Sequence, residues 1–316
     1  MQQCGVIIPV YNEAPGIKHF HESLVKSLNS IENIKWKIIY VNDGSLDDSL
    51  KNLNSLSANK SIEIVVLDFS RNFGKEAAVS AGIHEANSLS LDAAVILDSD
   101  GQHPVKLIGK FVEKWKQGSE VVVGIRKNSQ HEGLTKRLGS KLFYKSLKGL
   151  TDLEVIPGST DFRLIDALVI AEFTRLTEHN RITRGLIDWL GFKKEYVEFE
   201  ALEREHGQAT YSIKKLFALA INSYISLSMV PLYLSGYIGV LFIVLSLFTG
   251  VFVIVEQYIL KDPLLLNISG SAVLGILLIF LVGVILSSIG LIALYISRVL
   301  EEAQNRPLYI VRKKIV

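Results

Sequence analysis

Residues 95–101, Val-Ile-Leu-Asp-Ser-Asp-Gly, decide the fold that we expect for this chain. The apolar run 93–97 is typical of a strand buried on both faces, and it ends in two carboxylates, Asp98 and Asp100. An Asp-x-Asp at the carboxyl end of a strand places two oxygen ligands near one divalent cation, which in turn bridges nucleotide phosphates. A lone Asp-x-Asp is more often a turn or a helix cap, so the interpretation depends on the flanking sequence.

Segments typical of strands and helices alternate through the first two hundred residues. Amphipathic helical patterns, such as residues 16–28 and 104–116, separate short β-branched runs. This alternation predicts an α/β fold with a doubly wound, mostly parallel sheet and helices on both faces. The expected strands are residues 6–10, 37–41, 62–67, 93–97 and 120–124.

Polar residues follow four consecutive expected strands. Each group taken alone is also good turn chemistry. The carboxyl ends of parallel strands meet at one edge of a sheet, where ligands of such folds bind. Their coincidence therefore predicts a nucleotide site. The groups are Tyr-Asn-Glu at 11–13, Asn-Asp-Gly-Ser at 42–45, Ser-Arg-Asn-Phe-Gly-Lys at 70–75 and Asp-Ser-Asp at 98–100.

Composition limits the function classes. A net charge of +2 over 316 residues gives no case for nucleic acid as a partner. Cys4 is the only cysteine, which excludes an intrachain disulfide and a cysteine metal site. The N-terminus lacks a basic region before its apolar run and resembles a first strand rather than a signal peptide, so we expect this half of the chain in the cytoplasm.

The chain is also 49% hydrophobic, and its apolarity is concentrated after residue 215. Residues 216–255 and 264–297 contain no Asp, Glu, Lys or Arg, whereas about 20 apolar residues suffice to cross a bilayer. We expect membrane spans at 232–255 and 272–295. The basic residues of the C-terminal tail place both chain ends on the cytoplasmic side of an integral, multi-pass membrane protein.

The expected organisation has four parts, and we also consider homo-oligomerisation through the membrane helices. Residues 212–230 contain Asn and Ser and open beside Lys214-Lys215, which favours an amphipathic helix at the membrane interface. The parts are a cytoplasmic catalytic domain at 1–211, the interfacial helix at 212–230, a two-helix transmembrane hairpin at 231–297 and a basic tail at 298–316.

Several motifs resemble family-2 glycosyltransferases, and others resemble the branch that acts on polyisoprenyl phosphates. The resemblance to the broad family rests on residues 6–13 (Val-Ile-Ile-Pro-Val-Tyr-Asn-Glu), 41–45 (Val-Asn-Asp-Gly-Ser) and 97–104 (Leu-Asp-Ser-Asp-Gly-Gln-His-Pro). The resemblance to the branch rests on residues 158–164, 181–192, 204–211 and 306–309. The resemblance implies a nucleotide-diphospho-sugar transferase (GT-A type) fold and an inverting mechanism.

For the donor, the resemblance implies that Pro9, Tyr11, Glu13 and Asp43 hold the nucleoside, with the Asp43 carboxylate facing the base. Asp98 and Asp100 would hold Mg²⁺ or Mn²⁺ on the diphosphate, and this metal neutralises charge on the leaving group. Lys75 follows a glycine at the expected start of a helix and is placed to meet a phosphate. The alternative for Lys75 is a surface lysine in a first helical turn.

For the acceptor, a lipid phosphate is already ionised near neutral pH, so the enzyme needs cations more than a strong base. The candidate cations are Arg126, Lys136, Arg137 and Arg204. The alternatives are that residues 127–148 form a solvated basic helix or contact anionic lipid headgroups. Two departures from the branch pattern, Ala201 and Thr210, replace an expected Arg and Lys.

The catalytic set that we expect is Asp161, Asp100 and Arg204. Asp161 matches a position that the branch associates with catalysis. We assign it first to orienting the acceptor phosphate or a cation, and acting as a base is the alternative. Arg163, two residues later, is a candidate partner for Asp161.

We therefore expect a sugar transferase acting on polyprenyl (undecaprenyl) phosphate at the cytoplasmic membrane face, with UDP-glucose as the first candidate donor. GDP-mannose and a UDP-linked aminoarabinose derivative are the alternative donors. A processive polysaccharide synthase is disfavoured because no tryptophan follows an arginine, as its Gln-x-x-Arg-Trp motif requires. A membrane-anchored, nucleotide-binding scaffold without catalysis is the alternative of another class.

Overall fold

The computed structural model describes residues 1–56, 62–127, 158–179, 181–200 and 270–316, with short pieces between 237 and 255. It divides into two compact units. The first comprises Met1–Thr210 and Asn305–Val316, and the second comprises Tyr211–Gln304. The predicted interfacial helix at 212–230 lies outside the described residues.

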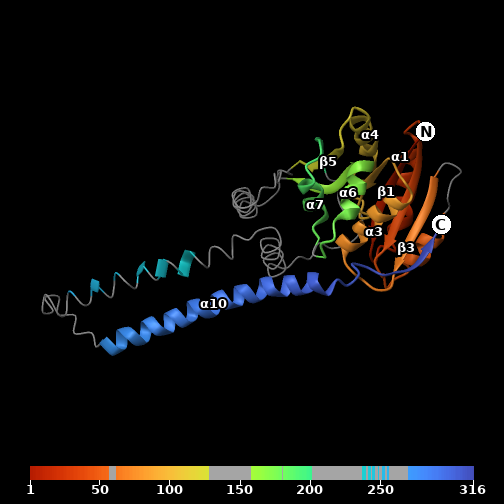
Figure 1. Cartoon of the computed structure of the whole chain (residues 1–316). Helices are drawn as coiled ribbons and strands as arrows, with labels where there is room; N and C mark the ends of the chain where they lie inside the picture. Colours follow the sequence, from red (N-terminus) through yellow and green to blue (C-terminus); the bar gives the residue numbers. More distant parts are fainter. Residues whose placement is uncertain are drawn as a thin grey trace. The chain divides into compact units, whose positions relative to one another are not determined.

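The first unit is built on one twisted sheet, which has eight strands among the described residues (Figure 1). The strands are β1 (Gln2–Val10), β2 (Ile34–Asn42), β3 (Ile62–Phe69), β4 (Ala93–Ile96), β5 (Val121–Arg126), β6 (Ser159–Asp166), β7 (Lys194–Phe199) and β8 (Val311–Ile315). Their order is β7-β5-β6-β4-β1-β2-β3-β8. β1 pairs in parallel with β2 and β4, and β2 pairs in parallel with β3, whereas β6 and β8 are antiparallel to their neighbours.

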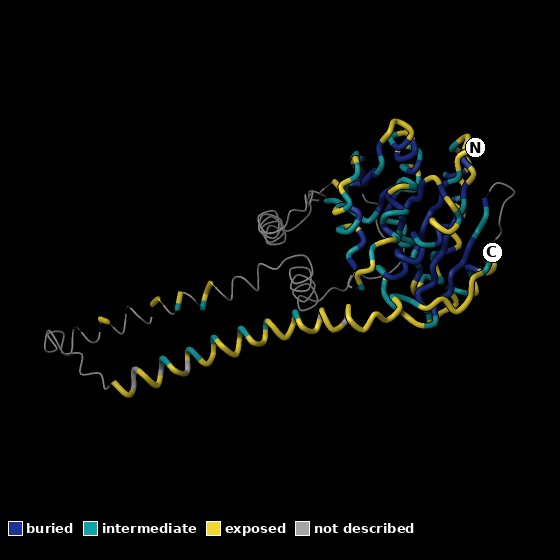
Figure 2. Tube along the Cα trace, in the orientation of Figure 1, coloured by how far each residue is buried: buried dark blue, intermediate teal, exposed yellow. Residues whose placement is uncertain are grey.

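Helices cover both faces of this sheet. They are α1 (Ile17–Asn29), α2 (Ser49–Asn54), α3 (Lys75–Ser88), the 3₁₀ turn η1 (Val105–Leu107), α4 (Ile108–Lys116), α6 (Ala167–Arg175) and α7 (Thr183–Trp189). One core joins α1, α2 and α4 to the sheet, and the other joins α3, α6 and α7 to the opposite face. Because successive side chains of a strand alternate, Val6 and Ile8 enter the first core and Ile7 enters the second. Figure 2 shows the resulting buried strands.

The α/β, mostly parallel fold is confirmed, and all five expected strands are present with ends shifted by a few residues. The helical pattern at 104–116 divides into η1 and α4. β6, β7 and β8 were missed. In particular, the basic tail contains β8, whose sequence Val-Arg-Lys-Lys-Ile has four exposed residues of five. Charged side chains of this kind are usual on an edge strand, so composition alone did not separate it from a solvated tail.

The second unit contains the helix α10 (Gly270–Gln304), which has 35 residues. Among the described residues, one segment is long and apolar enough to cross a membrane, Phe280–Gln304, which contains an 18-residue window with a mean hydropathy of 2.3. The expected span 272–295 lies within α10, which continues beyond the end expected for it. At a rise of about 1.5 Å per residue, this helix exceeds the ~30 Å hydrocarbon core of a bilayer. The other expected span, 232–255, lies mostly outside the described residues.

Candidate active site

The loops after β1, β2, β3 and β4 meet at one edge of the sheet, because these four strands run in the same direction. Two of the loops are joined by hydrogen bonds. The backbone N–H of Asn12 donates to Ser45 Oγ at 3.0 Å, and Asn12 Oδ1 accepts from the backbone N–H of Leu46 at 2.9 Å. The backbone N–H of Glu13 donates to Ser49 Oγ at 2.8 Å. Asn12 therefore has a structural role in fixing the rim.

Asp43, at the end of β2, fixes the loop between β3 and α3. Its two carboxylate oxygens accept hydrogen bonds from the backbone N–H groups of Phe73 at 2.7 Å and Gly74 at 3.0 Å. Burial raises the pKa of this carboxyl group, and the two backbone hydrogen bonds offset only part of that effect. Both carboxylate oxygens of Asp43 therefore hold the loop that leads to Lys75. The contact of Asp43 with a nucleoside stays a prediction.

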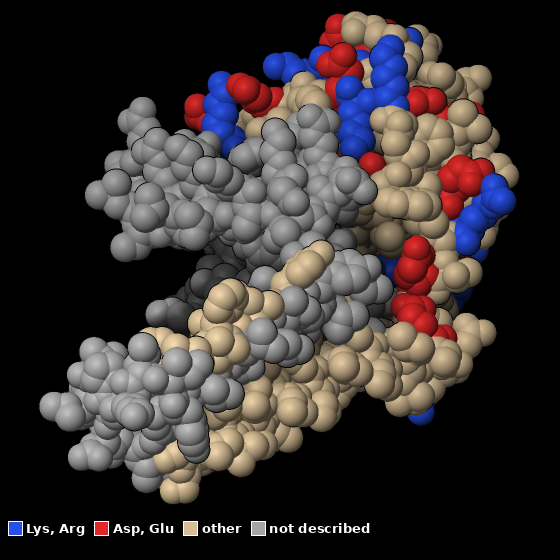
Figure 3. Space-filling model, turned by 60° about the vertical axis from the view of Figure 1, so that its left-hand side comes forward, with Lys and Arg blue, Asp and Glu red and all other residues tan. Residues whose placement is uncertain are grey.

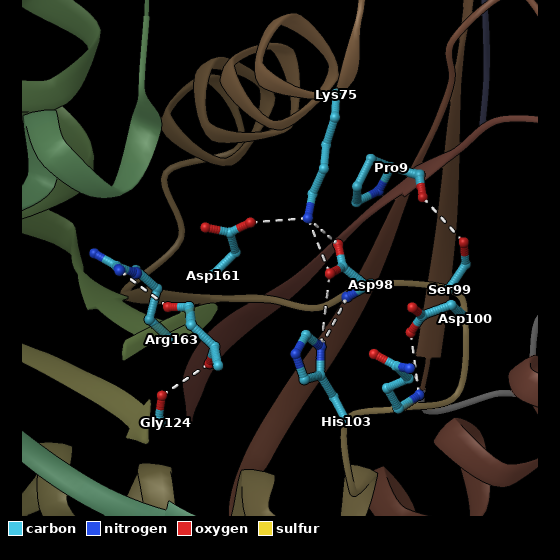
Figure 4. A network of polar contacts seen from close by, with 11 residues as sticks. Pro9, Lys75, Asp98, Ser99, Asp100, His103, Gly124, Asp161 and Arg163 are labelled. Carbon is cyan, nitrogen blue, oxygen red and sulfur yellow. Dashed lines mark hydrogen bonds and ion pairs between the residues drawn. The ribbon is translucent and has the colours of Figure 1, made fainter. Parts of the chain in front are cut away.

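Lys75 joins carboxylates from two strands (Figure 4). Its Nζ lies 2.7 Å from Asp98 Oδ1, after β4, and 2.8 Å from Asp161 Oδ2, on β6. Burial opposes the charge of Lys75, but the two carboxylates outweigh it and raise the pKa of Lys75. For Asp161, burial alone would raise the pKa. The positive charge of Lys75 and, more weakly, that of Arg184 outweigh burial, so the pKa of Asp161 is lowered. Both groups are charged at neutral pH.

Asp98 and Asp100 stand where a hard metal ion would be held. Asp100 Oδ1 accepts from the backbone N–H of Gln102 at 3.1 Å, which closes the turn between the two carboxylates and η1. No three His, Cys, Asp or Glu side chains converge on a metal position in the described part of the chain. Mg²⁺ and similar ions commonly take one or two carboxylates and complete their shell with water and phosphate oxygens. The two aspartates fit that pattern.

His103 packs between two phenylalanine rings and supports the turn at Asp98. Its ring stacks on Phe162 with centroids 5.1 Å apart and meets Phe199 edge-on at 5.8 Å. Burial lowers the pKa of His103, and the negative charge of Asp98 offsets this only in part. The neutral ring faces the backbone N–H of Asp98 with its Nδ1 at 3.4 Å. His103 therefore lies beside the two carboxylates as a supporting residue.

Two of the expected donor-site residues, Glu13 and Asp100, border the same hollow in the surface. A cavity of about 80 Å³ is lined by Glu13 and Asp100, together with His19, Ser99 and His103. Pro9 O accepts a hydrogen bond from Ser99 Oγ at 3.2 Å, which links the end of β1 to the Asp98 turn. The Tyr11 side chain is exposed at the same edge. The structure thus brings residues from the first and fourth loops together.

Arg163 was a candidate partner for Asp161, but its hydrogen bonds and ion pair are with other groups. Its side chain is fully buried, and its guanidinium donates to the backbone carbonyls of Thr160 at 3.0 Å and Arg184 at 3.3 Å. Its nearest carboxylate in an ion pair is Asp188, at 3.8 Å. The direct partner of Asp161 is therefore Lys75, a pairing that sequence distance along the chain gave no means of predicting.

Most of the expected acceptor cations lie outside the described residues. Arg126 is exposed at the end of β5, and its backbone N–H donates to Gly158 O at 2.9 Å. Lys136, Arg137 and Arg204 lie outside the described residues, as do Ala201 and Thr210. Acidic and basic side chains occur together over the face of the first unit seen in Figure 3, so that face presents no large region of one sign.

The open, mostly parallel sheet with a pair of carboxylates at its carboxyl edge agrees with a glycosyltransferase of the GT-A type, and the family model shows that class. The chain belongs to glycosyl transferase family 2, whose model matches residues 5–172. It is 37% identical to an uncharacterized glycosyltransferase of Synechocystis sp. over 98% of this chain and 94% of that protein. It is 32% identical to the SfII prophage-derived bactoprenol glucosyl transferase of Shigella flexneri over 98% and 97% of the two chains.

Proposed function

We propose that this glycosyltransferase moves a sugar from a nucleotide diphosphate donor to a polyprenyl phosphate. The observation that carries the proposal is the cluster in which Lys75 joins Asp98 and Asp161 at the carboxyl edge of the sheet. The lipid acceptor is supported by the apolar helix α10 and by the similarity to a bactoprenol glucosyl transferase over nearly the whole chain. UDP-glucose is the first candidate donor, and GDP-mannose and a UDP-linked aminoarabinose derivative are its rivals.

The donor would lie along the rim made by the first, second and fourth loops. Pro9, Tyr11, Glu13 and Asp43 are assigned to the nucleoside, and Asp98 and Asp100 are assigned to Mg²⁺ or Mn²⁺. When bound, the metal supplies neutralisation of charge on the leaving nucleoside diphosphate. The chain's own contribution is to hold the two carboxylates on a turn fixed by hydrogen bonds at His103 and Gln102.

The reaction is a single displacement. An oxygen of the lipid phosphate forms a bond to the anomeric carbon, while the bond from that carbon to the diphosphate oxygen breaks and its electron pair leaves with the nucleoside diphosphate. Attack from the opposite face inverts the anomeric centre. A phosphate monoester has a second pKa near 6, so it is largely ionised at pH 7 and needs no proton removed.

Asp161 is suited to positioning rather than to proton transfer. Its lowered pKa and its ion pair with Lys75 keep it ionised, so it is a weak base at neutral pH. We assign it to holding Lys75 beside the reacting phosphates. Arg126, Lys136, Arg137 and Arg204 remain the proposed cations for the acceptor phosphate, and Asp100 and Arg204 remain in the proposed catalytic set.

The catalytic unit would work at the cytoplasmic face of the membrane. We propose a catalytic domain at 1–211, an interfacial helix at 212–230, a transmembrane hairpin at 231–297 and a cytoplasmic tail at 298–316, with homo-oligomerisation through the hairpin as a further proposal. The length and apolarity of α10 support the membrane anchor.

The test is transfer of labelled sugar into an organic-extractable lipid. Membranes containing the protein are incubated with undecaprenyl phosphate and a panel of UDP- and GDP-sugars, with Mg²⁺, with Mn²⁺ and with EDTA. Metal-dependent label from one donor would support the reaction and identify the sugar. Absence of label from every donor, with UDP or GDP binding intact, would refute the transfer reaction and favour a nucleotide-binding scaffold.

A further inference from the structure

A second, smaller cavity is lined in part by Asp161 and presents an arginine that the assignments above leave without a role. Its volume is about 10 Å³, and Lys75, Asp161, Arg163 and Arg184 line it. The Arg184 side chain is exposed, and within the described part of the chain its guanidinium takes part in no hydrogen bond or ion pair. Its charge nevertheless acts on Asp161.

Arg184 is held in place through its backbone. Buried Arg163 donates from Nη1 to the carbonyl of Arg184 at 3.3 Å and from Nη2 to the carbonyl of Thr160 at 3.0 Å. The preceding residue, Thr183, donates its backbone N–H to Glu76 Oε2 at 2.7 Å. The first turn of α7 is therefore tied to both β6 and α3, while the Arg184 side chain keeps its donors for another group.

The charge balance of the site calls for such a group. Lys75 is already shared by two carboxylates, so its positive charge is locally neutralised. The proposed reaction brings a second phosphorylated molecule beside a nucleoside diphosphate. Guanidinium groups present several N–H donors in a fixed fork that matches phosphate oxygens, and such charge-assisted hydrogen bonds are among the stronger ones in proteins.

We propose that Arg184 binds a phosphate group of the reacting pair and that Arg163 positions it. The inference rests on the proposed function and adds a residue to it. The phosphate belongs either to the polyprenyl acceptor or to the donor diphosphate, and the two sources share the chemistry that Arg184 recognises.

The experiment compares the wild type with Arg184→Gln and with the control Arg175→Gln. Arg175 is an exposed arginine on α6 whose ion pair is with Glu172 of the same helix. The readouts are the KM for undecaprenyl phosphate, the KM for the donor sugar nucleotide, and calorimetric binding of UDP and GDP with Mn²⁺. Undecaprenol, which lacks the phosphate, serves as the competing lipid that should not inhibit.

Loss of one hydrogen bond to a charged group predicts a change of about tenfold or more. A rise of this size in the KM for undecaprenyl phosphate, with nucleotide binding unchanged, assigns Arg184 to the acceptor. An equal loss of nucleotide affinity, with the lipid KM unchanged, assigns it to the donor. Values within about twofold of the wild type and of Arg175→Gln in all three readouts would overturn the inference.

The positioning role of Arg163 has its own test. In Arg163→Lys we expect the same KM to rise as in Arg184→Gln, and we expect the double variant to be no worse than Arg184→Gln, because the two residues act as one unit. A purely structural role would lower Tm and leave that KM unchanged. If Arg163→Lys does not fold, Glu76→Ala loosens the same turn at Thr183 and should raise the same KM.

Failure of the inference and failure of the proposed function are distinguishable. A wild-type protein that transfers no sugar from any donor refutes the function. An active wild type whose Arg184→Gln variant is unchanged refutes only the inference.

Discussion

Replacing Lys75 by methionine removes the one positive charge that the structure places between Asp98 and Asp161. Methionine has a similar length and no charge, so the packing of the first turn of α3 should change little. The ammonium group lies 2.7 Å from Asp98 Oδ1 and 2.8 Å from Asp161 Oδ2, so the substitution breaks two ion pairs at once.

The magnitude follows from the exposure of these contacts. A hydrogen bond to a charged group contributes about 1.5–3 kcal/mol. Since 43% of the Lys75 side chain is exposed, solvent screens the pairs and we take the lower half of that range. We therefore expect kcat/KM to fall by about 13- to 45-fold. Burial would then act on Asp161 without opposition from Lys75 and raise the pKa of Asp161.

The assay is initial-rate transfer of labelled sugar to undecaprenyl phosphate across pH, for the wild type, Lys75→Met, Lys75→Arg and the control Lys18→Met. Lys18 is an exposed lysine on α1. Lys75→Arg should recover part of the loss because it keeps the charge. If Lys75→Met retains kcat/KM within about twofold of the wild type, the reasoning from the ion pairs is wrong.

Three other substitutions test separate parts of the structure. Asp98→Asn should abolish turnover nearly completely, whereas Asp48→Asn, an exposed aspartate without a side-chain cap bond, should leave transfer intact. Gly44→Ala should lower the free energy of unfolding by at least about 1–3 kcal/mol in chemical denaturation, because φ is +61° and a Cβ would collide with the backbone of Arg71. Glu63, whose pKa is lowered to about 2 chiefly by its hydrogen bond with Lys37, should stabilise the fold above pH 4.5 and lose this effect as the pH falls toward 2. Since Glu63 is partly exposed, its effect should be below about 1 kcal/mol, and the stability of Glu63→Gln should converge with that of the wild type in acid.

The parallel centre of the sheet was predictable from the sequence because its strands are buried on both faces and therefore form continuous apolar runs. β4 is the clearest case, with all four residues buried. β6 was harder, because its sequence Ser-Thr-Asp-Phe-Arg-Leu-Ile-Asp carries site residues and a buried arginine within the strand. β7 has three charged residues among six, two of them adjacent, and three of the five residues of β8 are charged. Pattern alone does not separate such strands from loops.

The candidate site, like the sheet, was only partly predictable from the sequence. Strand order determines which loops meet, so the grouping of the first four loops followed from the alternation of strands and helices. Side-chain partners depend on distances between residues far apart in the chain. Lys75 and Asp161 are 86 positions apart, and Asp43 meets the backbone of Phe73 across 30. Sequence reasoning assigned Lys75 and Asp43 to ligands and gave neither of these internal contacts.

The C-terminal strand connects these two observations. Ser70 opens the loop between β3 and α3, and its backbone N–H donates to Ile310 O at 3.0 Å, while its carbonyl accepts from Arg312 Nη2 at 2.7 Å. Asp43 holds the other end of the same loop just before Lys75. The loop is thus fixed at its start by the last residues of the chain and at its end by the second strand. A short basic segment that composition assigns to solvent is therefore part of the framework that places Lys75 between the two carboxylates.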